Sequence, residues 1–349
     1  MRSDVAARQA QRYQQEAQNS LTVYLLADIS DVDPFEDTER YGQELAPLVR
    51  DLVARSLPGS SFDRSLRRAA LRSTMLDLGK SLSGETQLRL KYAFRVLGFV
   101  EEEIRAARTG KWWIRARACH NLRLMHATDA LEVLSKNLED VYEDVRIEAA
   151  LSLLDIAGLN ALSPILLTID DISGWMKVRL SNSILGFGGD AVPHLVKGMK
   201  SEHPSVQLFC IEMLGRLGDV QAVPTLIEYI NYTVPEVQMT SLEAFGRIGD
   251  ARAVPVVLSF LDSNDKRIRI VAAKALGALG SPATVDVLNR LLLHDTIEVR
   301  LAAAEALSKI GDAGIRTLRY STQSSNESAR LVALQYLHEQ DIAQAGATA

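Results

Sequence analysis

The residues best suited to chemistry lie in one short stretch that combines tryptophans with cations. Trp112 and Trp113 stand among six basic residues, and no acidic residue occurs between Ile104 and Asp129. The six cations are Arg105, Arg108, Lys111, Arg115, Arg117 and Arg123. Cations beside aromatic rings can hold a phosphate or stack a nucleic-acid base. The same stretch can instead open a helix of a larger scaffold, with its rings buried at a seam between structural units.

The other residues with catalytic or ligand-binding potential lack the spacing that known chemistry requires. The six histidines include no pair four residues apart and no cysteine partner at zinc spacing. No nucleophile elbow, phosphate-binding loop or dinucleotide fingerprint occurs. Asp31 and Asp33 have a spacing found in calcium loops, but the glycine and glutamate of such a loop do not follow. The sequence predicts no enzyme activity, no cofactor and no metal site.

Charge and composition limit the partners and the compartment that we expect. Lys and Arg number 39 against 44 Asp and Glu, so the net charge of −5 gives no global attraction to nucleic acid. No stretch approaches the roughly 18 uncharged apolar residues of a membrane span, and the polar N-terminus lacks the apolar segment of a signal sequence. Cys119 and Cys210 fall in apolar helical patterns and should be reduced core residues. We therefore expect a cytoplasmic protein, while a membrane anchor upstream of this chain stays open.

A repeat with a regular period organises much of the chain, and one unit takes about 31 residues. Its signature is an apolar residue followed by Arg or Gln, and the sequence numbers of the eight copies differ successively by 31, 33, 28, 31, 31, 31 and 30. The copies are Ile114-Arg115, Val145-Arg146, Val178-Arg179, Val206-Gln207, Val237-Gln238, Ile268-Arg269, Val299-Arg300 and Ala329-Arg330. Each signature opens an amphipathic helix, and glycines twelve residues after four of them, such as Gly218 and Gly249, are expected to end it. A second apolar helix follows, so the unit is a pair of helices.

These units resemble the HEAT-repeat family, in particular the short bacterial HEAT-like repeats that also occur in phycobilin lyases. The order Asp, Val-Arg, Ala-Ala and Ala-Leu-Gly carries the resemblance and is clearest in residues 262–280 and 295–311. The resemblance implies an all-α fold, a right-handed α-α superhelix in which the second helix of each pair lines a concave face. We expect an irregular helical cap over residues 1–104, the repeat array over residues 105–342 and a disordered tail over residues 343–349.

Equivalent positions of neighbouring repeats should form columns on one face of the array. Two charged columns stand six and ten residues after the signature: Glu212, Glu243, Lys274 and Glu305, then Arg216, Arg247, Ala278 and Lys309. A glutamate four residues before Arg or Lys stabilises a helix by about 0.3–0.5 kcal/mol. A face that is charged but locally neutral suits a polypeptide of mixed charge better than a phosphate backbone. We therefore predict that Glu212, Arg216, Glu243, Arg247 and Lys274 bind a partner.

The signature arginines form another column, and acidic residues precede many of its members. Because an arginine can bind a carboxylate and loop carbonyls together, we expect a ladder of polar contacts between repeats. Trp175 lies where one spacing is two residues longer than the period and the next is three shorter, which marks either a bend, a partner site or drift. Trp112, Trp113, Arg115 and Trp175 complete the predicted partner-binding set.

The leading hypothesis is a non-catalytic protein-interaction scaffold or adaptor that binds a partner polypeptide, as part of a larger complex, on the concave face. One alternative is a ligand-handling HEAT enzyme similar to phycobilin lyases, and a small-molecule ligand stays open. HEAT-type deoxyhypusine hydroxylases use several His-Glu dipeptides, whereas only His338-Glu339 occurs here. The third hypothesis is a nucleic-acid binder through residues 105–123, a stretch that resembles HEAT-like DNA glycosylases. Those enzymes also need an aspartate near the rings, which this stretch lacks.

Overall fold

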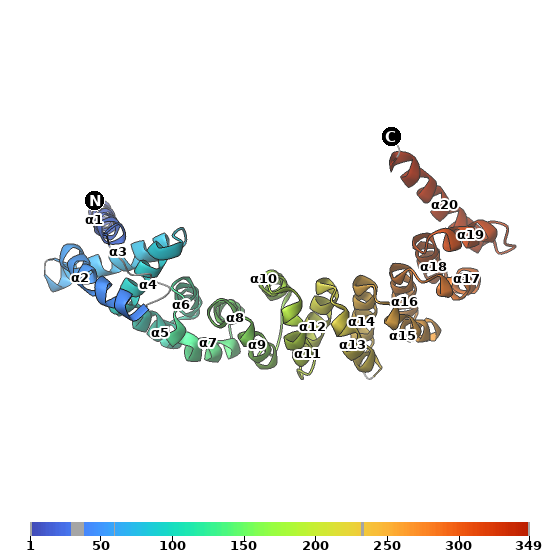
Figure 1. Ribbon diagram of the computed structural model, residues 1–349, viewed down its shortest axis with the longest axis horizontal. Coiled ribbons are helices and arrows are strands. Elements are labelled where there is room, and N and C mark those ends of the chain that lie inside the picture. The colour runs from blue at the N-terminus through green and yellow to red at the C-terminus, as the bar shows by residue number, and fades with distance from the viewer. Residues whose placement is uncertain (1, 29–37, 59, 232–233, 348–349) are drawn as a thin grey trace. The chain divides into compact units, whose positions relative to one another are not determined.

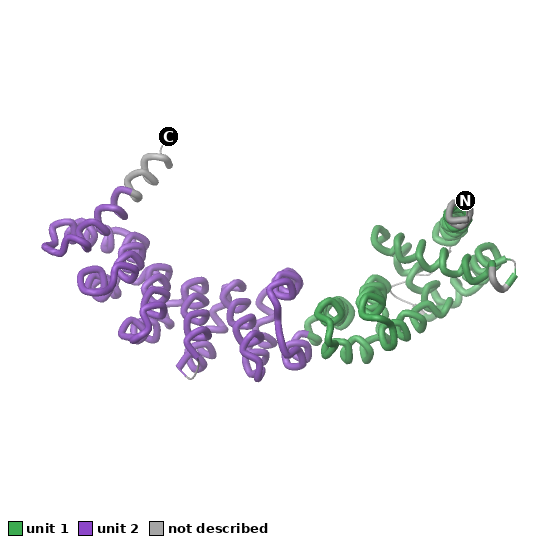
Figure 2. Tube along the Cα trace, turned by 180° about the vertical axis from the view of Figure 1, so that it is seen from behind, with its two compact units in different colours: residues 1–161 green, residues 162–349 purple. Residues whose placement is uncertain are grey.

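The computed structural model describes residues 2–28, 38–58, 60–231 and 234–347, and every regular element within these ranges is helical (Figure 1). This confirms the all-α prediction for the described residues. The connector that contains Asp31 and Asp33 lies outside them. The chain forms two compact units, residues 1–161 and 162–349 (Figure 2). The boundary expected between residues 104 and 105 falls inside a helix of the first unit, and the expected domain division stays a prediction.

The first unit, residues 1–161, contains eight α-helices among its described residues. They are α1 (Arg2–Leu25), α2 (Thr38–Ser56), α3 (Ser61–Gly79), α4 (Gly84–Val96), α5 (Phe99–Thr109), α6 (Trp112–Leu124), α7 (Leu131–Lys136) and α8 (Glu143–Ala157). Helix α1 packs on α2 and α3, and its Glu16 pairs with Arg67 of α3. The buried Arg89 of α4 donates hydrogen bonds to the carbonyls of Leu25 and Ala27, which end α1. The first helix is therefore fixed inside this unit.

The second unit, residues 162–349, continues the helix pairs. Its α-helices are α9 (Leu162–Thr168), α10 (Gly174–Leu185), α11 (Val192–Gly198), α12 (Pro204–Leu217), α13 (Val223–Ile230), α14 (Pro235–Ile248), α15 (Val254–Ser259), α16 (Lys266–Leu279), α17 (Val285–His294), α18 (Ile297–Lys309), α19 (Asp312–Ser321) and α20 (Glu327–Ala347). Because α20 runs to Ala347, a helix occupies most of the tail that the sequence predicts to be disordered.

Short 3-10 turns join many of these helices in both units. They are η1 (Thr128–Ala130), η2 (Asn137–Glu139), η3 (Gly158–Ala161), η4 (Gly188–Ala191), η5 (Val220–Ala222), η6 (Ala251–Ala253), η7 (Phe260–Asp262) and η8 (Pro282–Thr284). In the second unit the long signature helices α12, α14, α16 and α18 lie side by side as one layer, and the shorter α11, α13, α15 and α17 form the other (Figure 1). The repeating pair of helices is the unit that the sequence predicts.

Small residues set the close spacing of the signature helices. A Cβ atom on Gly215 would lie 2.9 Å from the Cα of Ala244, and one on Gly277 would lie 2.5 Å from the Cα of Ala306. These glycines stand nine residues after their signatures, and the alanines stand seven residues after the next ones. The sequence therefore keeps small side chains where the backbones of neighbouring helices approach each other.

The predicted helix ends are confirmed by backbone geometry. Gly218, Gly249, Gly280 and Gly311 have φ angles of 69°, 76°, 67° and 82°. Glycine reaches this left-handed region without the strain that a Cβ atom adds. The position twelve residues after Ile114 holds His126 instead, and its φ of 49° is the one positive value at a residue other than glycine in the described ranges. The first regular repeat thus carries a local strain that the later repeats avoid.

The structure corrects the predicted position of one repeat. Signature helices begin two residues before their apolar signature residue, and since α10 begins at Gly174, that residue is Met176 and not Val178. Met176 is fully buried, whereas Val178 is 55% exposed. Gly188, twelve residues after Met176, has the expected positive φ of 59°. The successive differences become 31, 31, 30, 31, 31, 31 and 30, so the irregularity near Trp175 came from alignment and marks neither a bend nor drift.

One stretch of the described residues, Glu143–Thr168, is long and apolar enough to cross a membrane by length and composition alone, with a mean hydropathy of 1.7. This corrects the expectation that no segment approaches such a composition. The stretch is divided into α8, η3 and α9, and 61% of its apolar window is buried inside the protein. Ala149, Leu151 and Ile165 are among the residues that fill the helical core there. The stretch is therefore weak evidence for a membrane span.

Candidate functional site

Two adjacent rows of side chains follow the signature helices of the second unit. The first row stands two residues after each signature and is apolar and partly exposed: Leu208, Met239, Ile270 and Leu301. The second row stands six residues after each signature and is charged: Glu212, Glu243, Lys274 and Glu305. Because residues four apart share one face of a helix, the two rows run side by side. We call the two rows, with Arg216, Arg247 and Lys309, the signature face.

Ion pairs link neighbouring members of the signature face. Glu243 pairs with Arg247 at 3.2 Å along α14, as the sequence predicts. Glu305 of α18 pairs with Lys309 at 2.7 Å and also lies 3.6 Å from Lys274 of α16. These pairs are exposed or partly exposed, so each contributes little to the stability of the fold. Their charged groups can therefore also bind charges of a ligand.

The predicted pair of Glu212 and Arg216 does not form. Arg216 lies instead 3.9 Å from the sulfur of Met213, one turn back on α12. Among the residues that the structure describes, Glu212 makes no side-chain ion pair. At this end of the signature face, an acidic and a basic side chain therefore form no ion pair with each other and can bind charged groups of a ligand.

Three signature arginines, Arg115, Arg269 and Arg300, form the predicted links between repeats, whereas Arg146 donates to the carbonyls of Asp140 and Val141 in its own loop. Arg115 donates to both carboxylate oxygens of Asp140, each at 2.7 Å, and Arg269 does the same to Asp295 at 2.9 and 2.8 Å. Each aspartate lies in the loop before the next signature helix. The third nitrogen of each arginine, Nη1, donates to a carbonyl of its own loop, that of Gly110 or Ser263. The ladder therefore fixes the spacing of consecutive repeats.

The remaining positions of the ladder vary around this arrangement. Arg300 donates to the side chain of Asn326 at 2.8 Å, and Gln207 binds only the carbonyl of Ser201 in its own loop. Arg179, which the sequence analysis places in this column, does not belong to it because the signature of α10 is Met176-Lys177. Its guanidinium carbon lies 5.9 Å from the ring centre of Trp175.

The ladder also controls the ionisation of its acids. Hydrogen bonds from Arg269 hold the pKa of Asp295 below its usual value, although burial opposes this effect. Burial alone would raise the pKa of Asp140. Hydrogen bonds from Arg115 and from the Tyr142 backbone outweigh that effect, so the pKa of Asp140 is lowered too. Arg115 thus has a structural partner, which leaves it less available for a phosphate than the sequence suggests.

The tryptophans of the first unit form a partly exposed aromatic cluster. Trp112 stacks on Tyr142 with ring centres 5.6 Å apart, and Trp113 meets Trp112 edge to face at 5.8 Å. Lys111 lies over the ring of Trp113 at 5.1 Å. Trp113 remains 49% exposed, so its ring is not buried at a seam between structural units. Trp175, in the second unit, is 58% exposed.

Comparison with known proteins bears on the fold of the second unit. A family model described as HEAT repeats matches residues 192–272 and again residues 254–338. These matches begin at the start of α11 and end within α20. Residues 192–338 are HEAT repeats. The resemblance found in the sequence is thereby confirmed over this range, and HEAT arrays commonly serve as scaffolds for protein interactions.

Several solved structures are similar to the HEAT array and its surroundings. An engineered protein has 19% identity and a TM-score of 0.38, with 93% of this chain and 98% of that chain covered. The complex of CpcE and CpcF of phycocyanin lyase from Nostoc sp. PCC7120 has 22% identity and a TM-score of 0.31, covering 69% and 87%. A Kap121p mutant has 13% identity and a TM-score of 0.45, covering 92% and 41%. A comparison with curated protein sequences gives no match.

No group of three or more His, Cys, Asp or Glu side chains in the described ranges is arranged to hold a metal ion. Cys119 and Cys210 are free and fully buried, as the sequence predicts for small core residues. Burial raises the pKa of the Cys119 thiol to about 11, and it raises that of Cys210 as well. Both thiols are therefore protonated at neutral pH and unsuited to act as nucleophiles.

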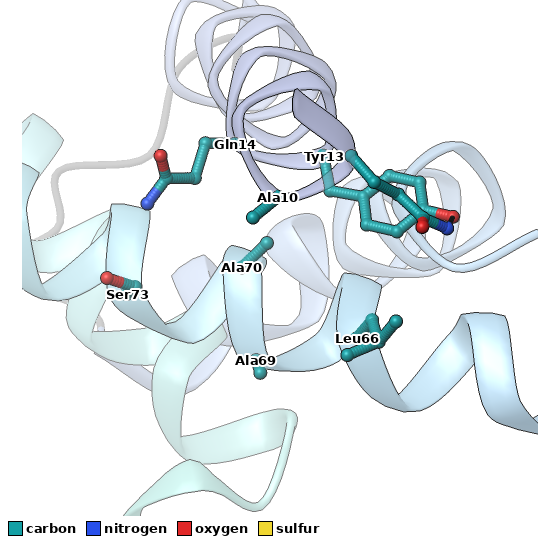
Figure 3. A pocket seen from close by; sticks show the side chains of 8 residues that line it. Ala10, Tyr13, Gln14, Leu66, Ala69, Ala70 and Ser73 are labelled. Carbon is teal, nitrogen blue, oxygen red and sulfur yellow. Dashed lines mark hydrogen bonds between the residues drawn. The ribbon is translucent and has the colours of Figure 1, made fainter. Parts of the chain in front are cut away.

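The first unit contains an apolar groove of about 310 Å³ between α1 and α3. Figure 3 shows Ala10, Tyr13 and Gln14 of α1 across from Ala69 and Ala70 of α3. Most of its surface is apolar, although Gln9, Tyr13, Gln14 and Ser73 also line it. It has the form of a helix-packing groove more than of a reaction centre.

A second cavity of about 420 Å³ lies among α3, α5 and α6, ahead of the HEAT array, and its lining is polar. Glu103 and Asn121 are both buried there, at 4% and 7% exposure. Arg72, Arg117 and His120 also line it. Sequence reasoning missed this site because its residues come from three helices. One signal was present, since Asn121 occupies a position that holds Ala244, Ala275 and Ala306 in later repeats.

Proposed function

We propose that this chain is a non-catalytic, cytoplasmic protein-interaction scaffold that binds a partner polypeptide on the signature face of its HEAT array. The observation that carries the proposal is the row of partly exposed apolar side chains beside a row of charges across α12, α14, α16 and α18. Apolar side chains of a partner can bury on the first row, while charges of both signs on the second row fix its register.

The charges of the signature face favour a polypeptide over a nucleic acid. The charged positions are Glu212, Glu243 and Glu305 against Arg216, Arg247, Lys274 and Lys309, so the two signs nearly cancel. Binding to a phosphate backbone needs a large surplus of positive charge, whereas this face carries four cations against three acids. A partner segment with interspersed acidic and basic residues and periodic apolar side chains complements it.

The aromatic side chains that the sequence also assigned to partner binding lie elsewhere on the chain. Trp112, Trp113 and Arg115 belong to the first unit, and Trp175 is the second residue of α10. The exposure of Trp113 and Trp175 supports their use as additional contacts, since buried aromatic anchors often dominate the energy of an interface. Their contribution is proposed as secondary to that of the signature face.

The proposal is tested by affinity capture from a native lysate with quantitative mass spectrometry. One variant reverses four charges of the signature face: Glu212→Arg, Arg216→Glu, Glu243→Arg and Arg247→Glu. A matched control reverses Glu228 and Arg290, which are exposed on the other helix layer. We expect at least a tenfold loss of the specifically captured protein in the first variant and no loss in the control. If both variants fold correctly and capture equal amounts of the protein, the signature face is not the binding site.

A further inference from the structure

The cavity among α3, α5 and α6 departs from the packing of three later repeats. Those three carry an alanine seven residues after the signature, which packs against a glycine of the preceding signature helix, as Ala244 does against Gly215. The first repeat places Asn121 there, at 7% exposure. A buried amide costs free energy unless it is hydrogen-bonded, so a polar residue at this position needs a polar counterpart.

That counterpart is Glu103 of α5. Asn121 lies close enough to its carboxyl group to affect the pKa of Glu103, and Arg72 of α3 lies 3.6 Å from that carboxyl group. Burial raises the pKa of Glu103, and Asn121 and the cations Arg72 and Arg117 act against that rise. The floor of the cavity is therefore a polar group of three side chains in which Arg72 compensates the carboxylate.

The wall of the cavity adds cationic and hydrogen-bonding groups to this floor. Arg117 forms no hydrogen bond or ion pair within the described residues, while the nearby Lys80 is paired with Asp77 at 2.9 Å. Arg117 thus adds a positive charge to the cavity that no acidic side chain there neutralises by direct contact.

The ring of His120 adds a directed donor. The Nη2 atom of Arg123 and the Oε2 atom of Glu148 lie 2.9 Å and 3.4 Å from its Nδ1 atom. When Nδ1 accepts from Arg123, the proton of the neutral ring lies on Nε2, and when both ring nitrogens are protonated, Nε2 donates as well. His120 lines the cavity, so Nε2–H is the donor that this ring can offer to a bound molecule.

We propose that this cavity binds a small organic anion, a carboxylate or a phosphate ester of metabolite size. The anionic group contacts Arg117 and the Nε2–H of His120, and a hydroxyl or amino group of the same molecule donates to Glu103. A volume of about 420 Å³ lies in the range of small-molecule sites, which is roughly 300–1,000 Å³. The proposal is independent of the partner face in the second unit, because every residue in it belongs to α3, α5 or α6.

The proposal is tested by thermal unfolding and calorimetric titration of the full chain with citrate, L-glutamate and glycerol phosphate. Sodium chloride at matched ionic strength is the reference, since a general salt effect does not saturate. We expect saturable stabilisation by at least one of the three anions, with one site per chain. Saturation by a carboxylate or by the phosphate ester alone identifies the anionic group. Absence of saturable binding for all three would overturn the proposal.

Variants separate a ligand site from a purely structural polar cluster. Arg117→Ala should weaken binding at least tenfold without loss of folding, because Arg117 is exposed and unpaired. Asn121→Ala should also weaken binding, although it restores the residue that later repeats carry. Arg105→Ala is the matched control, since Arg105 is an exposed cation of α5 that does not line the cavity. Binding that is unchanged in Arg117→Ala, or weakened equally in Arg105→Ala, would contradict the assignment.

Discussion

Arg269 and Asp295 join two consecutive repeats through a two-pronged hydrogen bond, with Nε to Oδ2 at 2.9 Å and Nη2 to Oδ1 at 2.8 Å. Their side chains are 16% and 14% exposed, so solvent screens them less than it screens surface pairs. The same relationship recurs between Arg115 and Asp140. In both cases the aspartate in the loop before a signature helix binds the arginine of the preceding signature helix, so the loop connects two helix pairs.

Replacing Arg269 with Ala should lower the free energy of unfolding by about 1–3 kcal/mol, because it leaves the mostly buried Asp295 carboxylate without its partner. Urea unfolding followed by circular dichroism measures this change. Glu298→Gln is the control, since Glu298 pairs with Lys266 in an exposed contact and should change stability by less than about 0.5 kcal/mol. Equal effects of the two substitutions would show that the ladder has no special role.

The stability contribution of Asp295 should depend on pH. Hydrogen bonds from Arg269 lower its pKa below the value of 3.8 that it has when unfolded. A group with a lowered pKa contributes stability fully above the unfolded value, and that contribution is lost as the pH falls through the folded one. The wild type should therefore lose more stability than Asp295→Asn between pH 5 and pH 2.5 in urea titrations. Parallel pH profiles would contradict this assignment.

His126→Gly should stabilise the protein by about 0.5–1 kcal/mol, because glycine relieves the strain of a positive φ at some cost in backbone entropy. The matched control is Gly249→Ala, which places a Cβ atom at a φ of 76° with no other atom within 4 Å. It should destabilise by about 1 kcal/mol through backbone strain alone. Thermal and urea unfolding measure both. A destabilised His126→Gly would mean that the imidazole makes a contribution larger than the strain.

The position of the third signature predicts opposite outcomes for two nearby residues. Met176→Ala should cost about 2–5 kcal/mol because Met176 is fully buried. Val178→Ala should change stability by less than about 0.5 kcal/mol because Val178 is mostly exposed. Urea unfolding of the two variants compares them directly. The reverse order would restore the alignment on Val178-Arg179.

Sequence alone predicted the fold of the array well because each repeat obeys the same local rules. The signature residues, the glycine that ends each helix and the small residues at the contacts all recur at fixed offsets, as at Val237 and Gly249. It misplaced one repeat because Val178-Arg179 has the letters of the signature, while the unbranched Met176 fills the core position. Only the buried side of α10 and the positive φ of Gly188 distinguish the two.

The functional residues were harder to predict because they depend on contacts between helices. The pair of Glu212 and Arg216 has ideal spacing, yet Arg216 turns toward Met213. Glu103 and Asn121 lie on two consecutive helices, α5 and α6, and their spacing in the sequence does not show that both side chains face one cavity. Repeats constrain the core at each position, whereas the cavity beside Asn121 lies where the first repeat departs from three later ones.

The central claim is that a polypeptide lies on the signature face of the HEAT array. The most direct test places a photo-crosslinking amino acid at residue 239, on α14 of that face, or at residue 256, on α15 of the other layer. Both native side chains are partly exposed, so the two sites are matched in accessibility. After irradiation of a native lysate, residue 239 should give a discrete adduct with another protein, and residue 256 should not. Adducts from residue 256 alone, or the same adducts from both sites, would contradict the account.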